Sequence, residues 1–588
     1  MDKKRYSFCL SRALDTLGYS YECIKQRQKS WKHCGECLTA DEEENVSDMI
    51  AGSKSEGVSR IFESDFDLMV SLDDFICYEL IDDIKENDID KRVKQRVLSA
   101  TKNYQYEVGM KSSNAESVSD TEISRDSDYT ANIQNNIEEA RKRLTSIDLK
   151  ITKSEQNIAV IEKNSIVKYN GIFLLDSENI SMGYAVLKVV HLNEQKLLKS
   201  YVQENCAFVD AIIELDGTKV ISSSRFREFS YKCDEDEFTQ TVDGPAGTSL
   251  ADPYSGSVCD VDSVFCIPCV CKSINQAWVN RKRNYRWPCK ELIEEISRLD
   301  GHVVPVGNKK SKTSDIEWRI CFTKSEVKLI HSFNETQVKL YVLIKMVGKA
   351  LLKPICSDIS SYTLKNVMLW LAEKIPFERY EIENLYGLLR VALKFLRYSI
   401  DKRSLPNYMI PERNLFLAKI PTDERENVLK VLDGIINDNT FFITKFQELN
   451  FLAQHMVICI NEPELAFYME RNRELFEKIF LENWRDVWEF RTPDFLHTCT
   501  KQCICLTAML QICDLLKVSS KTRNCVIEKV FWWITGKMGA VAADDGRTSR
   551  STCWFWNDFG EILPLFMQEE NKLNAYRVFI DSREKKKC

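Results

Sequence analysis

The stretch from residue 52 to residue 70 constrains this chain more than any other. It reads Gly-Ser-Lys-Ser-Glu-Gly over 52–57 and Ser-Asp-Phe-Asp-Leu-Met-Val over 64–70. Side chains along a strand alternate between two faces, so Asp65 and Asp67 share one face, and the apolar residues that follow each of them share the other. The sequence therefore predicts a strand with one acidic face, preceded by a glycine turn.

The acidic face predicts a site for divalent metal. Two carboxylates about 7 Å apart along a strand repel each other, and both stay ionised when cations lie between them. In the turn, Gly52 permits a tight backbone whose N–H groups can face an anion, and Ser53 adds a hydroxyl. Metal and phosphate would then share one pocket. The competing interpretation is an edge strand with a solvated acidic face, which a lone Asp-x-Asp pattern also fits.

Length and composition define the class of protein. The chain has 588 residues, 44% hydrophobic and 29% charged, which is ordinary for a globular protein of two or three domains. A formal net charge of −7 argues against a generally basic coat for nucleic acid, but it is compatible with local basic patches. Without a signal peptide or an apolar run of 18 residues, we expect a cytoplasmic protein with no membrane contact, whose 22 cysteines are reduced.

The spacing of the two motifs resembles that of a known family. Twelve positions separate Ser53 from Asp65, and the words around them are similar to those of invertebrate cyclic GMP-AMP synthase-like receptors and their male-abnormal-twenty-one relatives. The resemblance implies an α+β fold, a bilobal polymerase-β-like nucleotidyltransferase with a mixed-sheet core and a helical C-terminal lobe. Strand patterns near 184–191, 207–215 and 218–222 fit the core.

The chemistry of this fold needs a third acid on a neighbouring strand, and residues 259–267 contain two candidates. Asp260 and Asp262 alternate onto the same face. We choose Asp262, because the Asp-x-Val-x-x-Ile pattern and the segment 277–288 after it resemble the family's order of elements, and Asp260 stays an alternative. Four cysteines nearby suggest either a metal site or buried core thiols; they are Cys259, Cys266, Cys269 and Cys271.

The resemblance also implies nucleotide-binding residues in the later part of the chain. Arg319 matches an arginine that holds a nucleotide base, and Lys345 matches a lysine that contacts phosphate. The triplet Ser360, Ser361 and Tyr362 matches a Ser-Ser-Tyr that grips phosphate and stacks on a base. Taken singly, the arginine or the lysine could be a surface cation, and the tyrosine could be a core residue. Helices are predicted over 335–353, 360–374 and 380–400 from apolar residues at three-and-four spacing.

The domain organisation follows from these motifs. We expect an N-terminal helix and the first part of the core over 1–80, an insertion over 81–165, the rest of the core over 166–325, a helical lobe over 326–425 and a helical extension over 426–588. Within the insertion, 112–130 has the composition of a disordered linker, and 133–161 carries a heptad pattern. That heptad predicts self-association, partner docking or packing on the protein's own surface.

Two further segments bear on activation. Residues 1–32 are rich in Lys and Arg and resemble the long family helix that borders the ligand-sensing surface, although a solvated helix face has the same composition. The basic run 281–290 suits phosphate or nucleic-acid contact, or a scaffold role. Vertebrate cyclic GMP-AMP synthase grips DNA with a zinc thumb of one His and three Cys, but here no cysteine precedes Cys356 in the corresponding segment. We therefore expect that the protein binds no zinc. The activating ligand is expected to be double-stranded RNA or another ligand.

Together these features predict a nucleotidyltransferase, and the resemblance implies that it is activated by a ligand and acts in innate immune signalling. It would use Mg²⁺ or Mn²⁺, held by Asp65, Asp67 and Asp262, to make a cyclic dinucleotide from ATP and GTP. The cyclic product is implied by the resemblance alone, since the acids specify only nucleotidyl transfer. The alternatives are a catalytically silent scaffold protein with this fold and a linear oligonucleotide synthase of the same superfamily.

Overall fold

The computed structural model describes residues 2–41, 46–60, 66–79, 169–197, 203–215, 217–230, 240–243, 246–249, 261–416, 420–437, 451–467, 469–471, 473–474, 477–478 and 481. The predicted insertion over 81–165, with its heptad pattern, lies outside these residues. So do Asp65 and Asp260, which come just before described strands.

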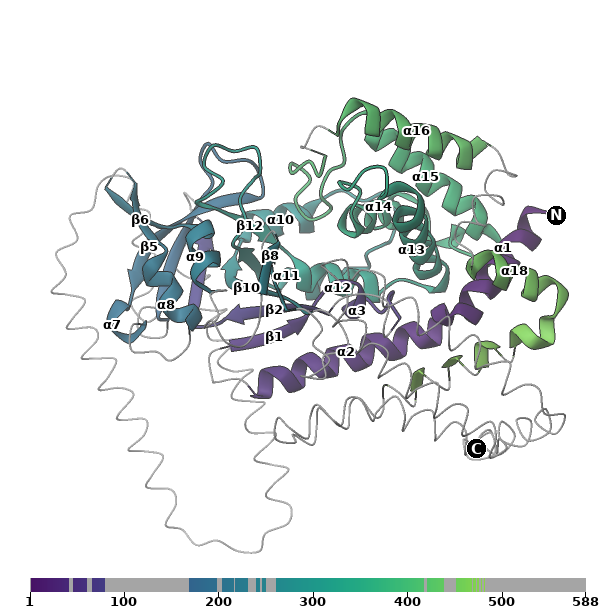
Figure 1. Ribbon diagram of the computed structural model, residues 1–588, viewed down its shortest axis with the longest axis horizontal. Coiled ribbons are helices and arrows are strands. Elements are labelled where there is room, and N and C mark those ends of the chain that lie inside the picture. Colours follow the sequence, from purple (N-terminus) through teal and green to yellow (C-terminus); the bar gives the residue numbers. More distant parts are fainter. Residues whose placement is uncertain are drawn as a thin grey trace, which may run out of the picture.

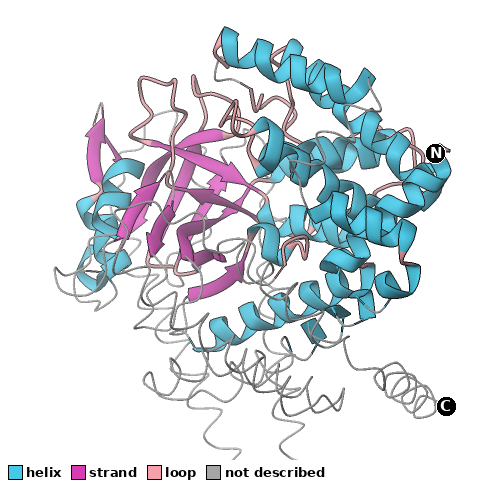
Figure 2. Ribbon diagram, turned by 45° about the vertical axis from the view of Figure 1, so that its right-hand side comes forward, coloured by secondary structure: helices cyan, strands magenta, loops and turns pink. Residues whose placement is uncertain are grey.

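A mixed sheet occupies one side of the described structure and helices occupy the other, which agrees with the predicted α+β class (Figures 1 and 2). The main path of strands runs β1-β2-β10-β11-β12-β5-β4-β3, with β7 pairing β5 and β9 pairing β10. Strand β10 runs parallel to β2 and β3, and β3 runs parallel to β4, while the other neighbours are antiparallel. The strands are β1 (Val46–Ile50), β2 (Phe66–Leu72), β3 (Phe75–Glu79), β4 (Gly171–Asp176), β5 (Tyr184–Leu192), β6 (Ile212–Leu215), β7 (Thr218–Ile221), β8 (Gln240–Asp243), β9 (Ala246–Ser249), β10 (Val261–Val270), β11 (Gly301–Val304) and β12 (Glu317–Cys321).

Helices α8 (Gln203–Asp210) and α9 (Ser223–Ser230) cover one face of the sheet. Their aromatic side chains pack onto the strands: the ring centroid of Phe208 lies 4.0 Å from that of Phe75, and Phe226 lies 5.3 Å from Trp318. The prediction of a strand over 207–215 is wrong in its first part. Residues up to Asp210 belong to α8, and β6 begins only at Ile212. The buried residues Ala207, Phe208 and Ala211 are at helical spacing. Trp318 precedes Arg319 on β12, so Arg319 faces the opposite side of the sheet.

The helical side is built around α13 (Glu335–Val347), which is buried at nearly every position. Its N-terminus is closed by a capping box in which Asn334 and Gln337 bond each other's backbone N–H groups. The helices predicted over 335–353, 360–374 and 380–400 are present, with shifts of a few residues at their ends. The remaining elements are α3 (Gly52–Ser55), α7 (Glu194–Leu197), α10 (Lys272–Asn280), α11 (Lys290–Ser297), α12 (Thr323–His331), η4 (Gly348–Leu352), α14 (Ser361–Lys374), η5 (Phe377–Arg379), η6 (Ile382–Asn384), α15 (Leu385–Asp401), α16 (Thr422–Asn437) and α18 (Phe451–Asn461).

The N-terminal segment is two helices rather than one. Helix α1 (Lys3–Leu14) is followed by η1 (Asp15–Tyr19) and then by α2 (Tyr21–Asp41), and the chain bends at Gly18, whose φ is +89°. Figure 1 shows α2 running from beneath β1 toward the helical side, where α1 continues. This segment therefore contacts both sides of the described structure.

Helix α18 and described residues after it pack against that N-terminal segment. The Oγ1 of Thr16 lies 2.7 Å from Nδ1 of His455, and the buried guanidinium of Arg27 pairs with Glu477 at 2.5 Å. Helix α16 spans the predicted boundary at 425, and the stretch beyond it returns to the start of the chain. Among the described residues, no helix combines the length and the apolar character needed to cross a bilayer.

Candidate active site

Asp67 and Asp262 are direct neighbours on parallel strands. The register of β2 and β10 pairs them, so their side chains leave the same face of the sheet, about 5 Å apart at their backbones. Both are only partly buried. Two carboxylates at this spacing repel each other and favour a cation between them. The structure thus brings together two of the three predicted acids, and Asp65 lies outside the described residues.

The glycine turn lies against this acidic pair. The backbone of Gly52 has φ +62°, and a Cβ placed on it would come within 1.8 Å of Oδ2 of Asp67. Ala51 N–H also donates to the carbonyl of Asp67 at 2.8 Å. Only glycine fits here, because both the positive φ and the contact with Asp67 exclude a side chain. The turn therefore approaches the acidic strand by backbone alone.

Ser53 meets the predicted phosphate-contacting lysine. Lys345 projects from α13, and its Nζ donates to the Oγ of Ser53 at 2.5 Å. Its ammonium group also lies 5.5 Å from the ring centroid of Tyr341. Two residues assigned to phosphate from separate motifs are thus in contact, and they lie next to the acidic pair. A hydroxyl and an ammonium group at this position can both donate to phosphate oxygens.

A buried network of charges fixes the end of the turn to the helices. Lys365 of α14 bonds Glu56 at 3.0 Å and Glu326 at 2.8 Å, while the hydroxyl of Tyr341 donates to Glu56 at 2.9 Å. Burial alone would lower the pKa of Lys365, but the carboxylates of Glu326 and Glu56 outweigh it and raise that pKa well above its usual value. The network holds the Gly-Ser turn against α12, α13 and α14. Sequence reasoning missed it, although Glu56 lies within the motif.

Arg319 lies on the same face of the sheet as the two acids. Through the registers of β10, β11 and β12, this face runs from Asp262 across an apolar patch to Arg319. The patch contains Met69, Val264, Cys266, Val304 and Cys321. Burial and the neighbouring Arg413 lower the pKa of Arg319. The face therefore has an acidic end and a basic end, separated by an apolar patch in which Met69, Cys266 and Val304 are buried.

The Ser-Ser-Tyr triplet begins helix α14. Ser360 and Ser361 are exposed, and the side chain of Ser360 caps the helix by accepting from Thr363 N–H at 3.3 Å. The hydroxyl of Tyr362 donates to Glu326 at 2.8 Å and accepts from the amide of Asn407 at 2.8 Å. Burial, with the charge of Glu326, raises the pKa of Tyr362. Ser360 thus has a structural role besides any contact with phosphate.

The donor set suits a hard cation. In the described part of the chain no three His, Cys, Asp or Glu side chains converge as a metal site. Asp67 and Asp262 nevertheless provide adjacent carboxylate oxygens, the ligands that Mg²⁺ and Mn²⁺ prefer. The cysteines behave differently: burial raises the pKa values of the Cys266 and Cys269 thiols, which supports the core interpretation.

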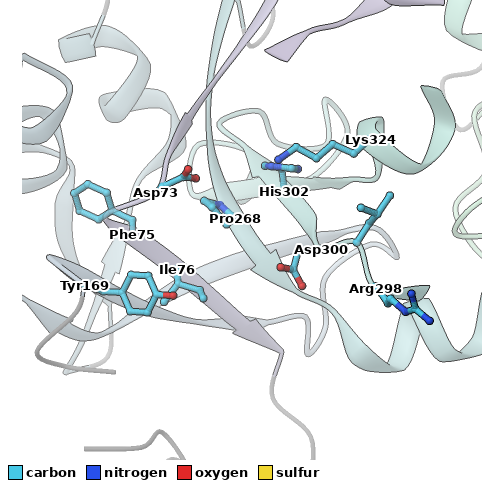
Figure 3. A pocket seen from close by; sticks show the side chains of 10 residues that line it. Asp73, Phe75, Ile76, Tyr169, Pro268, Arg298, Asp300, His302 and Lys324 are labelled. Atoms are coloured by element: carbon cyan, nitrogen blue, oxygen red, sulfur yellow. The ribbon is translucent and has the colours of Figure 1, made fainter. Parts of the chain in front are cut away.

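A separate cavity of about 440 Å³ lies farther along the same sheet face (Figure 3). Among the residues that line it are Asp73, Pro268, Asp300, His302 and Lys324. None of the residues predicted from the sequence lines this cavity. Its walls carry charges of both signs, so it does not compete with the acidic pair as the candidate metal site.

Comparison with protein families agrees with the described geometry. Residues 144–332 match the Mab-21 protein nucleotidyltransferase domain, and residues 328–434 match the Mab-21 protein HhH/H2TH-like domain. Over residues 144–434 the chain belongs to the Mab-21 protein family. The first match begins inside the predicted insertion and ends one residue after α12, and the second extends from α12 into α16.

The two matched ranges contain most of the candidate site of this Mab-21 protein. Asp262 and Arg319 lie in the nucleotidyltransferase domain, and Lys345 and the Ser-Ser-Tyr triplet lie in the HhH/H2TH-like domain. Gly52, Ser53 and Asp67 precede both ranges, so their place in the site rests on the register of β2 with β10 and on the bond between Ser53 and Lys345. The roles of all these residues stay predictions.

Proposed function

We propose that this Mab-21 protein is a ligand-activated nucleotidyltransferase that makes a cyclic dinucleotide from ATP, GTP or both in cytoplasmic innate immune signalling. The observation that carries the proposal is the pairing of Asp67 with Asp262 beside the Gly52 turn. The contact of Ser53 with Lys345 supports it, because it offers two donors for phosphate next to the acids. The proposal takes the sheet and helical sides as the two lobes of a polymerase-β-like enzyme.

The chain's own residues account for orientation and proton transfer. Lys345 and Ser53 bind the triphosphate of one nucleotide, and Tyr362 stacks on a base at the other end of the face. A ribose hydroxyl of a second nucleotide attacks the α-phosphorus, a phosphodiester forms, and the bond to pyrophosphate breaks. Asp262 accepts the proton of the attacking hydroxyl. Bound Mg²⁺ or Mn²⁺, held by Asp67 and Asp262 and, on our prediction, by Asp65, would neutralise charge on the triphosphate.

Cyclisation repeats the same step on the linear product. The free hydroxyl of the linear dinucleotide attacks the α-phosphorus of the triphosphate that it still carries, and a second pyrophosphate leaves. The dinucleotide must turn over within one pocket for this to occur. A product that stops at the linear stage would indicate a linear oligonucleotide synthase instead.

The proposed activator is double-stranded RNA or another anionic ligand, and the basic run 281–290 divides into two groups. Arg281 and Arg283 each bond Glu373 at 3.1 Å and serve the scaffold. Lys282, Arg286 and Lys290 are exposed and suited to phosphate contact. Self-association through 133–161 stays part of the proposal.

The test is a synthesis assay with the purified full chain, labelled ATP and GTP, and Mn²⁺, with and without double-stranded RNA or DNA. We expect pyrophosphate release and a product that resists phosphatase, as a cyclic dinucleotide does. Asp67→Asn should abolish both, whereas Glu214→Gln, an exposed carboxylate on β6, should leave them unchanged. No product under any condition would favour the silent scaffold and overturn the proposal.

A further inference from the structure

Two arginines lie around one tyrosine at the end of the sheet face that lies away from the acids. Arg319 is paired in register with Tyr184 across β12 and β5. The guanidinium carbon of Arg413 lies 5.3 Å from the ring centroid of that same tyrosine. Cross-strand partners share a face, so Arg413, Arg319 and Tyr184 are in one cluster on the face that carries Asp262.

The backbone holds Arg413 in this place. Gly183 has φ +83°, and a Cβ on it would come within 2.7 Å of Cδ of Arg413, so this side chain lies directly across the glycine. Arg413 also closes its own loop, because its carbonyl accepts from Asn407 N–H at 2.8 Å and its N–H donates to Ile410 at 2.9 Å. The loop therefore brings Arg413 from the helical side to the edge of the sheet face.

The two guanidinium groups have no carboxylate partner among the described residues. Neither appears in an ion pair or as a side-chain donor to protein, although Arg413 is only 8% exposed. Buried charges in proteins are normally paired, and two like charges side by side raise each other's cost. Burial, and then the charge of Arg413, lower the pKa of Arg319. Burial raises the pKa of Tyr362, and the charge of Arg413 opposes that rise. Two cations of this kind, one buried and one half-buried, are suited to an anion supplied from outside.

We propose that Arg319 and Arg413 form a second phosphate-binding site, which holds a phosphate group of the other nucleotide or of the linear dinucleotide. The proposal deepens the proposed function, because it rests on nucleotides being the ligands of this face. Arginine forks donate in pairs to phosphate oxygens, and the two groups here would neutralise a divalent anion. With Lys345 and Ser53 beside the acids, the face would bind phosphate at both ends, which would fix the order in which the two nucleotides lie.

A competing assignment for the same cluster is that both arginines read a base edge. Guanine presents two acceptors that a guanidinium can bond. The two assignments differ in one respect, because a phosphate site binds inorganic pyrophosphate and a base-reading site binds guanosine without phosphate.

The experiment measures binding without turnover. Calorimetry on the full chain carrying Asp67→Asn would give dissociation constants for inorganic pyrophosphate, ATP, GTP and guanosine at two or more salt concentrations. Adding Arg413→Gln should weaken ATP, GTP and pyrophosphate by about tenfold to a hundredfold and reduce the salt dependence of binding, as expected for one lost charge-assisted bond. Arg413→Lys should keep part of the affinity. Arg379→Gln, which removes an exposed arginine of η5, should change none of these values.

The melting temperature shows whether the Arg413→Gln variant is folded. Because the ligand-free pair repels, Arg413→Gln should melt no lower than the parent. It should lose the part of the pyrophosphate stabilisation that comes from the arginine site and keep the part that comes from Lys345 and Ser53. Unchanged dissociation constants for pyrophosphate and ATP would overturn the proposal, and so would a loss confined to guanosine and GTP. The proposed function is tested separately by turnover, so failure of synthesis with intact binding would refute the enzyme and not the phosphate site.

Discussion

The two ends of one sheet face differ in charge and in how they are held. At one end Asp67 and Asp262 are neighbours on parallel strands, fixed by backbone pairing. At the other end Arg319 is on a strand, but Arg413 reaches it from a loop of the helical side. The acidic end is thus built largely within the sheet, whereas the basic end exists only where the two sides of the molecule meet. A change in how the sides meet would alter the basic end first.

The largest effect should come from Lys365, because its network joins both ends. Lys365→Met would leave Glu56 and Glu326 buried without their cation, and we expect a loss of about 3 to 5 kcal/mol in the free energy of unfolding. Urea unfolding measures this. Lys353→Met, at an exposed lysine beyond η4, is the control and should lie within about 0.5 kcal/mol of the parent. Equal effects of the two variants would show that the network does not stabilise the fold.

Gly52→Ala should separate the ends. Its Cβ would displace the carboxylate of Asp67, so synthesis should fall by about a hundredfold, the cost of a misplacement of about 1 Å. Pyrophosphate binding at the arginine end should be unchanged. Gly387→Ala is the matched control, because the added methyl group would have no atom within 4 Å other than those of its chain neighbours and its own helix backbone, and the site is in helix α15. Full activity in Gly52→Ala would contradict the close approach of the turn.

Lys345→Ala tests the phosphate donors beside the acids. We expect KM for the triphosphate to rise by about tenfold or more, since a hydrogen bond to a charged group contributes about 1.5 to 3 kcal/mol. Steady-state kinetics on ATP and GTP would show it. The exposed Lys349, one turn farther on, serves as the comparison, and Lys349→Ala should leave KM as it is.

The smallest effect concerns a region away from both ends. Burial, with the charges of Arg473 and Arg60, lowers the pKa of His455 to about 3 in the folded chain, against 6.5 unfolded. The folded state therefore binds fewer protons, so this contribution to stability is present above pH 6.5 and is lost as pH falls toward 3. At pH 5.5 the loss should be about 1.4 kcal/mol.

Unfolding midpoints are measured at pH 7.5 and 5.5 for the parent and for His455→Gln. The loss of stability between the two pH values in the parent, minus that in the variant, gives the contribution of His455. The subtraction cancels other groups, including His331, whose pKa burial also lowers. A parent and a variant with the same pH dependence would rule out His455 as the source.

The sequence predicted the parts of the site that are written in local order. Asp67 follows from alternation along its strand, Gly52 follows from its place before that strand, and the choice of Asp262 comes from the order of elements in the resembling family. Alternation alone could not choose between Asp260 and Asp262. It also could not show that the start of 207–215 is helical, because three apolar positions there fit both the helix period and the strand period.

The rest depends on contacts between residues far apart in the chain. Glu56, Glu326 and Lys365 meet only after the turn, α12 and α14 have packed, and each alone is an ordinary charged residue. Arg413 is similar, because its significance comes from Tyr184 and Arg319 on distant strands. No spacing rule on a single sequence relates such positions.

The most direct measurement compares three single substitutions in one synthesis assay. Asp67→Asn, Asp262→Asn and Asp260→Asn would be assayed for pyrophosphate release with ATP, GTP and Mn²⁺, after each has been shown to melt like the parent. Because Asp67 and Asp262 are partners in register, both of their variants should fall to background, and Asp260→Asn should keep measurable activity. Normal activity in Asp262→Asn, with loss in Asp260→Asn, would contradict the pairing on which the site is built.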